Sequence, residues 1–125
     1  MNSSGKNKMS FELDFKGGKI WCEHLDSMGS HEDEVIEKFQ KDSVTFFRPS
    51  ISSFMIISLQ NTVLTPKIAE CISDTIIGGK KRFMRISFHG VEYANRKILK
   101  KIKKQCNTIV GFHSDFEKAK KWVLD

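Results

Sequence analysis

The chain has 125 residues and a formal net charge of +6; 39% of its residues are hydrophobic and 29% are charged. This length predicts one domain that can bury a core, and no apolar run reaches the ~20 residues of a membrane span. Cys22, Cys71 and Cys106 are far apart in the sequence, which argues against a disulfide framework or a zinc site and favours reduced, mostly buried thiols in a cytoplasmic protein.

The positive charge is concentrated in one part of the chain. Residues 1–62 carry 7 Lys and Arg against 9 Asp and Glu, whereas residues 63–125 carry 14 against 6. Ten of the 21 basic residues lie between Lys80 and Lys104, with Glu92 as the single acid among them. A local positive field attracts anionic partners or surfaces.

The amino-terminal part predicts a tail followed by a hairpin. Residues 1–10 are polar and lack the apolar segment of a signal peptide, so we expect a disordered tail. Residues 11–15 alternate apolar and polar side chains, and Gly17 and Gly18 permit the positive φ of a tight turn. Residues 11–25 are therefore expected to form a β-hairpin.

A helix and a short strand are expected next. Ser30 can cap a helix over residues 31–41, which has three acids in its first turn, where the helix dipole favours negative charge. Val35 and Phe39 begin an apolar stripe at helical spacing. Residues 44–47 are rich in β-formers and predict a short strand.

From residue 54 onward the pattern alternates between strands and helices. The apolar run at 54–59 is typical of a strand that is covered on both faces. Thr65 and Pro66 suit the first positions of a helix that Gly78 ends. The remaining expected elements are a strand at 82–88 with Met84, Ile86 and Phe88 on one face, a helix at 92–106, a strand at 108–112 and a closing helix capped by Ser114.

This order predicts a single α/β domain over residues 11–125, with a mixed, partly parallel sheet. Strands separated by helices favour right-handed crossovers, and hence parallel strands in the carboxy-terminal half. Residues 11–41 are too few to fold alone, so we expect them to add a β-hairpin and a helix to a core formed by residues 42–125.

Basic residues of the helix expected at 92–106 are candidate binding residues. They form either an electrostatic surface for an acidic protein, an anionic ligand or nucleic acid, or an ordinary solvated helix face. Like charges four residues apart destabilise an isolated helix, and an anionic partner would offset that cost. The candidate contact residues are His89, Asn95, Arg96, Lys97, Lys100, Lys101 and Lys104.

Two histidines, His89 and His113, each follow an expected strand. The carboxyl ends of parallel strands are where open α/β sheets place their sites, so the two imidazoles could share a ligand, a proton or a metal ion. A metal would need a further ligand, and Asp115 or Glu92 is the nearest in the sequence. The alternative is two loop histidines that cap the strand ends.

Recognisable catalytic motifs are absent from the sequence. It has no nucleophile elbow, no glycine-rich phosphate loop and no dinucleotide-binding fingerprint. The spacings of helix-turn-helix and zinc-finger domains are missing as well. We therefore expect a protein that is not an enzyme and has no cofactor.

Three local features carry a resemblance to a known family. They are the apolar strand 53–59 with the helix start at 65–69, the strand and loop at 82–91, and the closing helix 115–123 with its acidic-x-x-x-Ala-x-x-Trp pattern. In these features residues 44–125 resemble the STAS domains of bacterial anti-sigma-factor antagonists, and also a shorter STAS-like group related to lipid-binding domains. The resemblance implies a STAS-like fold and a regulatory role through contact with a protein partner.

One functional position departs from the STAS pattern. In anti-sigma-factor antagonists, the loop after the second strand carries Asp-Ser-Ser-Gly, whose serine is phosphorylated by a partner kinase. Residues 90–96 read Gly-Val-Glu-Tyr-Ala-Asn-Arg, with no serine or threonine, and the acid expected near Val63 is also missing. The resemblance therefore implies a relative that does not switch, or that switches differently.

We expect a regulatory module that contacts a protein partner or an anionic ligand through the loop and basic helix at residues 89–104. Two alternatives stay open. One is a nucleic-acid-binding domain that uses the basic residues 80–104. The other is a small-ligand or enzymatic site near His89 and His113.

Overall fold

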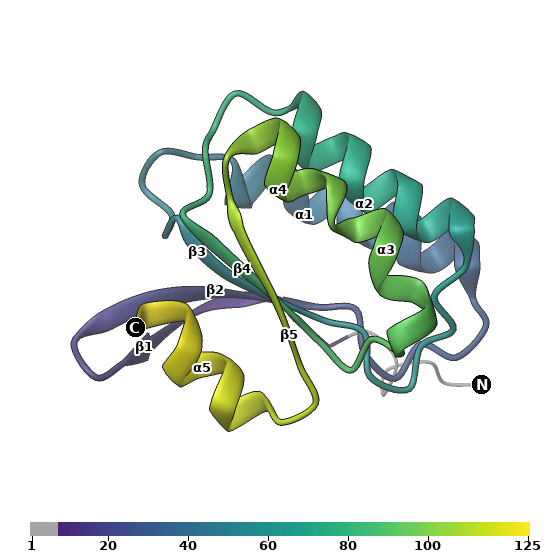
Figure 1. The fold of residues 1–125 in the computed structure, drawn as a ribbon, viewed down its shortest axis with the longest axis horizontal. Coiled ribbons are helices and arrows are strands. Elements are labelled where there is room, and N and C mark those ends of the chain that lie inside the picture. Colours follow the sequence, from purple (N-terminus) through teal and green to yellow (C-terminus); the bar gives the residue numbers. More distant parts are fainter. Residues whose placement is uncertain (1–7) are drawn as a thin grey trace.

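The computed structural model describes residues 8–125 and shows a single α/β domain (Figure 1). One sheet holds five strands in the order β1-β2-β3-β4-β5, and helices cover both of its faces. This architecture confirms the predicted α/β class. None of the helices formed by residues 8–125 has the length and apolar character needed to cross a bilayer.

The sheet is mixed, as predicted, and its carboxy-terminal half is parallel. The hairpin expected at 11–25 is present, and its second strand pairs in parallel with the next strand along the chain. The remaining neighbours also pair in parallel. The strands are β1 (Phe11–Phe15), β2 (Gly18–His24), β3 (Phe54–Ser58), β4 (Arg85–His89) and β5 (Ile109–His113).

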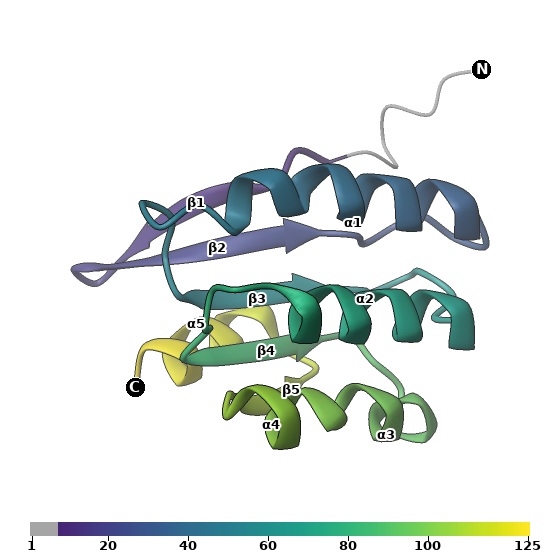
Figure 2. The same ribbon diagram turned by 90° about the horizontal axis from the view of Figure 1, so that it is seen from above.

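All crossover helices lie on one face of the sheet, and the closing helix lies on the other (Figures 1 and 2). Consecutive strands are neighbours, so the chain winds in one direction without reversing. The crossover face holds α1 (Glu32–Phe46), α2 (Pro66–Gly78), the short helix η2 (Tyr93–Asn95), α3 (Arg96–Leu99) and α4 (Lys101–Cys106), and the other face holds α5 (Phe116–Leu124).

Two apolar layers hold this arrangement together. The larger lies between the sheet and the crossover helices, and the smaller lies under α5. Successive β3 residues alternate between them: Met55 and Ile57 belong to the larger layer and Ile56 to the smaller. This alternation explains why the run at 54–59 is apolar without interruption, and it confirms a strand covered on both faces.

The first helix is longer than the sequence predicted, and the strand expected at 44–47 does not form. Helix α1 continues to Phe46, whose ring is buried against Phe39 and Phe83, with centroid separations of 5.5 and 5.8 Å. Packing of Phe46 therefore outweighs the local β-propensity. The predicted cap is also wrong, because His31 rather than Ser30 occupies the N-cap position, and its side chain makes no capping bond.

Other boundaries differ by a few residues. Helix α2 begins after Thr65, whose hydroxyl accepts a hydrogen bond from the Ile68 amide, and it ends at Gly78 as predicted. Helix α5 is capped by Asp115 instead of Ser114. Strand β4 begins only at Arg85, so Met84 is exposed instead of sharing the buried face of Ile86 and Phe88.

The sequence predicted that the three cysteines are reduced and mostly buried. All three cysteines are free thiols; Cys22 is buried, whereas Cys71 and Cys106 are half-buried. Burial raises the pKa of Cys22 to about 11, although Lys120 opposes the shift.

Residues 1–7 of the predicted tail lie outside the described residues. Ser10, the last residue of that predicted tail, packs on the domain and accepts a hydrogen bond from the His24 amide at 2.9 Å.

Candidate functional site

The carboxyl ends of the parallel strands carry a row of polar side chains. His24, Ser58, His89 and His113 are register partners on β2, β3, β4 and β5, so they lie side by side across the sheet. The Ser58 hydroxyl lies 2.8 Å from His89 Nδ1. Another serine, Ser87, lies 2.7 Å from His113 Nδ1. The structure thus brings the two predicted histidines together, but each ring pairs with its own serine.

Helix α5 covers this polar row. The Phe116 ring meets His89 edge-on at 5.3 Å and stacks on His24 at 6.1 Å. Ser58 is only 3% exposed and His89 only 5%. A nucleophile and base that are closed to solvent cannot reach a substrate, so the geometry favours a packing role for this pair.

Burial also sets the charge of these rings. Desolvation lowers the pKa of His89, although the nearby Asp26 and the Ser114 backbone oppose it. Desolvation, followed by the charge of Arg96, lowers the pKa of His113. Both rings are therefore held neutral near pH 7, which suits the hydrogen bonds to serine. Across residues 8–125 there is no group of three or more His, Cys, Asp or Glu that could hold a metal ion.

Asp26 anchors the end of this row beside β2. Its carboxylate lies 2.9 Å from His24 Nδ1 and 2.8 Å from Lys8 Nζ. Burial alone would raise the pKa of Asp26, but the hydrogen bonds from His24 and Lys8 outweigh it and hold the pKa well below its usual range. The carboxylate is therefore ionised and fixed by two donors.

The basic segment is not the continuous helix predicted at 92–106. It is divided into η2, α3 and α4, and the second break falls at Lys100, whose amide contacts both Arg96 O and Lys97 O. Crowded lysines at i,i+4 positions weaken a helix at this point. The side chains of Leu99 and Ile102 are fully buried nonetheless.

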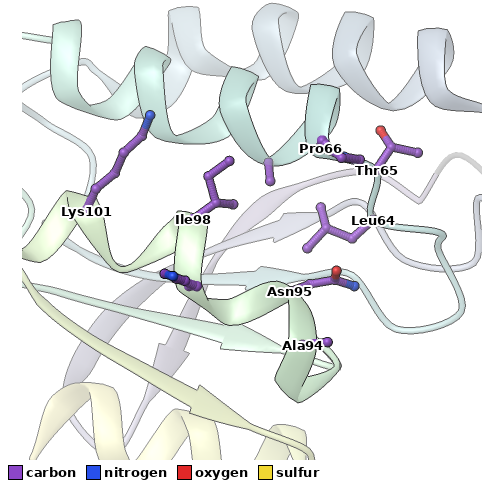
Figure 3. Close-up of a pocket in the computed structure, with 9 residues that line it drawn as sticks. Leu64, Thr65, Pro66, Ala94, Asn95, Ile98 and Lys101 are labelled. Carbon is purple, nitrogen blue, oxygen red and sulfur yellow. The ribbon is translucent and has the colours of Figure 1, made fainter.

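An apolar groove opens between the start of α2 and this broken segment (Figure 3). Its volume is about 480 Å³. On the side of α2 it is lined by Leu64, Thr65, Pro66 and Ala69, and on the other side by Ala94, Asn95, Lys97, Ile98 and Lys101. We call this hollow the α2–α3 groove.

A larger hollow of about 730 Å³ adjoins the α2–α3 groove, since Leu64 and Asn95 line both. It follows the loops after β3 and β4, at the carboxyl edge of the sheet. Gly90 allows these loops to approach, because its φ is +80° and a Cβ there would lie 2.7 Å from Gln60 Cα. The two hollows therefore adjoin each other at the carboxyl edge of the sheet.

The predicted contact residues fall in four places. Asn95, Lys97 and Lys101 line the α2–α3 groove, whereas Lys100 and Lys104 line a separate hollow beside β5. Arg96 lies between two rings, 5.5 Å from the centroid of Tyr93 and 5.1 Å from that of Phe112. His89 belongs to the buried row under α5 and does not join them.

Charge pairing separates the lysines further. Lys101 is bound to Glu70 at 3.1 Å and to Asp74 at 3.4 Å on α2; the hydrogen bond with Glu70 is the largest factor that raises the pKa of Lys101. Lys97 is exposed and makes no ion pair with any residue from 8 to 125. Lys97 is therefore the cation of the groove that is available to a partner.

Sequence reasoning missed the apolar lining and one aromatic ring. Leu64, in the loop before α2, and Ala94, in η2, are far apart in the sequence, and only the fold brings them together. Tyr93 is 80% exposed beside Arg96. A lone tyrosine at the start of a basic segment was the signal that could have identified it.

Comparisons with models of protein families, with curated proteins and with solved structures give no match.

Proposed function

We propose that this chain is a non-enzymatic regulatory module that binds a protein partner through the α2–α3 groove. The observation that carries the proposal is the chemistry of this groove, whose lining is largely apolar and includes the exposed Lys97, which makes no ion pair within residues 8–125. Ligand and peptide sites are typically concave and apolar, with a few polar groups that fix orientation. The site fits a partner segment that inserts an apolar side chain and places an acidic residue at Lys97.

Two further points support the proposal. One side of the groove, from Ala94 to Lys101, lies within residues 89–104, which the sequence predicted as the contact surface. The two sides of the groove differ in helix length, since α2 is a capped helix of 13 residues whereas η2 has 3 and α3 has 4. A short helical segment adjusts its position at lower cost than a long one, so it can fit a partner.

Site-specific photo-crosslinking tests the proposal. A photoreactive residue at the exposed positions 94 or 97 should capture a defined protein from native lysate, and Ala94→Trp, which fills the groove, should abolish capture from position 97. The control is the same photoreactive residue at Lys118 on α5, which should not capture it. Equal capture from positions 97 and 118, or capture that survives Ala94→Trp, would contradict the proposal.

A second candidate function is nucleic-acid binding. The observation that favours it is Tyr93, an exposed ring beside Arg96, with the exposed Lys97 and Lys100 close in sequence. Aromatic rings next to cations stack on unpaired bases. Phosphate contacts make affinity fall steeply with salt, so a gel shift of a single-stranded oligonucleotide at low salt that Tyr93→Ala weakens would favour this candidate. Absence of a shift at low salt would remove it.

A further inference from the structure

Strand β5 is an outer strand of the sheet, and no strand formed by residues 8–125 lies beside its second edge. The Ile109 amide donates to Met84 O at 3.2 Å, and His113 O accepts from the Gly90 amide at 3.0 Å, so these two residues face β4. In a parallel ladder, the residues between such positions point the other way. The N–H and C=O groups of Val110 and Phe112 therefore point outward from the sheet.

Strand β5 itself contains no charged residue or proline that would protect its outer edge. The opposite outer strand, β1, has Glu12 and Asp14 within it. Strand β5 has neither a charged residue nor a proline, and Ile109 is 50% exposed. Since edge strands in proteins are normally protected by in-strand charge, proline or a cover, an unprotected edge is a candidate for pairing with another strand.

Cations line the same edge on the crossover face. A hollow of about 520 Å³ lies between α4 and β5, lined by Lys100, Lys103, Lys104, Val110 and Phe112. The three lysines are exposed and make no ion pair with residues 8–125, and the lining contains no acid. Figure 2 shows α4 beside β5 at this end of the sheet.

We propose that β5 accepts an extended acidic segment of a protein partner as an added strand. Backbone hydrogen bonds with Val110 and Phe112 would provide the pairing, and carboxylates on one face of the segment would meet Lys100, Lys103 and Lys104. The inference goes beyond the proposed function, because it uses a different surface and does not require the α2–α3 groove.

Other occupants fit this edge less well. Pairing of β5 with β5 of a second copy would bring the lysines of both copies to one junction, where like charges repel. Residues 1–7 of the chain contain a lysine and no acid, so they lack the complementary charge. A phosphodiester backbone would match the lysines but has no donors for the outward carbonyls of Val110 and Phe112. An acidic strand satisfies both requirements.

Peptide display on the intact chain tests this proposal. Peptides of about eight residues, the length of an ordinary strand, should be selected with acidic side chains at alternate positions. Val110→Pro should weaken their binding about tenfold or more, because it removes an outward N–H while leaving the ladder with β4 intact. Replacing both Lys100 and Lys103 with Glu should weaken it similarly, whereas replacing both Lys118 and Lys121 on α5 should not, although the change in net charge is the same.

A second measurement leaves the protein unaltered. Synthetic copies of the selected peptides, N-methylated at alternate residues, keep their charge but cannot pair along the methylated edge. The unmethylated peptides should slow hydrogen exchange at Val110 and Phe112, and the methylated ones should not.

Equal binding of methylated and unmethylated peptides would overturn the proposal. Peptides that do not slow hydrogen exchange at Val110 and Phe112, and that a single-stranded oligonucleotide displaces, would also overturn it. Loss of binding in Ala94→Trp but not in Val110→Pro would assign the peptides to the α2–α3 groove and likewise overturn it. The reverse pattern would support strand addition even if the groove has no partner.

Discussion

The carboxyl groups of Glu23 on β2 and Asp42 on α1 lie close enough for each to shift the pKa of the other. Glu23 is fully buried; its Oε1 accepts from Trp21 Nε1 at 3.0 Å, whereas its Oε2 has no donor among residues 8–125. Asp42 accepts from Lys38 and Ser10. A proton on Glu23 Oε2, donated to Asp42, satisfies both carboxyl groups.

The pKa values of the two carboxyl groups are shifted in opposite directions. Burial, followed by the hydrogen bond and charge of Asp42, raises the pKa of Glu23 to about 9. Burial alone would raise the pKa of Asp42, but hydrogen bonds from Glu23 and Lys38 lower it. At neutral pH the pair therefore holds one proton and one negative charge, with Lys38 as the counter-ion at 2.8 Å.

The Glu23 proton predicts a loss of stability at high pH. In the unfolded chain this carboxyl ionises near pH 4.5, whereas in the folded chain it keeps its proton up to about pH 9. Between these values the folded chain binds more protons, so the free energy of unfolding falls as pH rises. Glu23→Gln should flatten this slope and stabilise the protein at pH 8 by about 1–3 kcal/mol, because the amide keeps both hydrogen bonds.

Urea unfolding at a series of pH values measures this effect. Glu37→Gln is the control, because it makes the same replacement at an exposed residue of α1. Unfolding free energies of Glu23→Gln and the native chain that run parallel across the whole pH range would show that Glu23 is ionised in the folded protein.

The buried pair of Ser58 and His89 predicts that loss of the serine hydroxyl destabilises the protein. Ser58→Ala would leave His89 Nδ1 buried without its partner at 2.8 Å, so we expect a loss of about 1–3 kcal/mol in the free energy of unfolding. Ser30→Ala is the matched control, since Ser30 is exposed and does not cap α1. Denaturant titration of both variants measures the difference; an unaffected Ser58→Ala would mean that water replaces the hydroxyl and that the row is open to solvent.

Two glycines give a prediction with opposite signs. Gly90→Ala would place a Cβ 2.7 Å from Gln60 Cα and force a positive φ on alanine, so we expect a loss of about 2 kcal/mol or more. Gly78→Ala meets nothing within 4 Å at the last residue of α2 and should be neutral or gain up to about 1 kcal/mol. Thermal unfolding compares them, and equal Tm values would show that the loops after β3 and β4 are not in close contact.

Local signals in the sequence were sufficient for elements whose ends are fixed by their own residues. Thr65 and Pro66 predicted the start of α2, and the alternation at 11–15 predicted the first strand of the hairpin. Elements fixed by distant contacts were not predictable in this way. The burial of Phe46 depends on Phe83, a residue that follows α2 in the sequence and is therefore 37 positions away.

The candidate site was likewise predictable where local residues determine it and unpredictable where distant contacts determine it. A basic segment after β4 was predicted, and it lines both hollows beside α2 and β5. His89 was predicted as a contact residue, but the sequence does not indicate which face of the sheet α5 covers, and Phe116 closes that face over the ring. The α2–α3 groove depends on the meeting of Leu64 with Ala94, which only the packing of α3 against α2 determines.

The end of α1 offers a direct test of packing against propensity. Val44 is 69% exposed on this helix, so Val44→Ala should be neutral or stabilising by about 0.5 kcal/mol, because alanine is the better helix former. In a strand the same change would be destabilising, because valine is the better strand former. Phe46→Ala should lose about 3–5 kcal/mol, since it empties a buried site between Phe39 and Phe83. Urea unfolding of both variants decides between the two structures: a destabilised Val44→Ala together with a tolerated Phe46→Ala would mean that residues 44–47 form the strand that their composition favours.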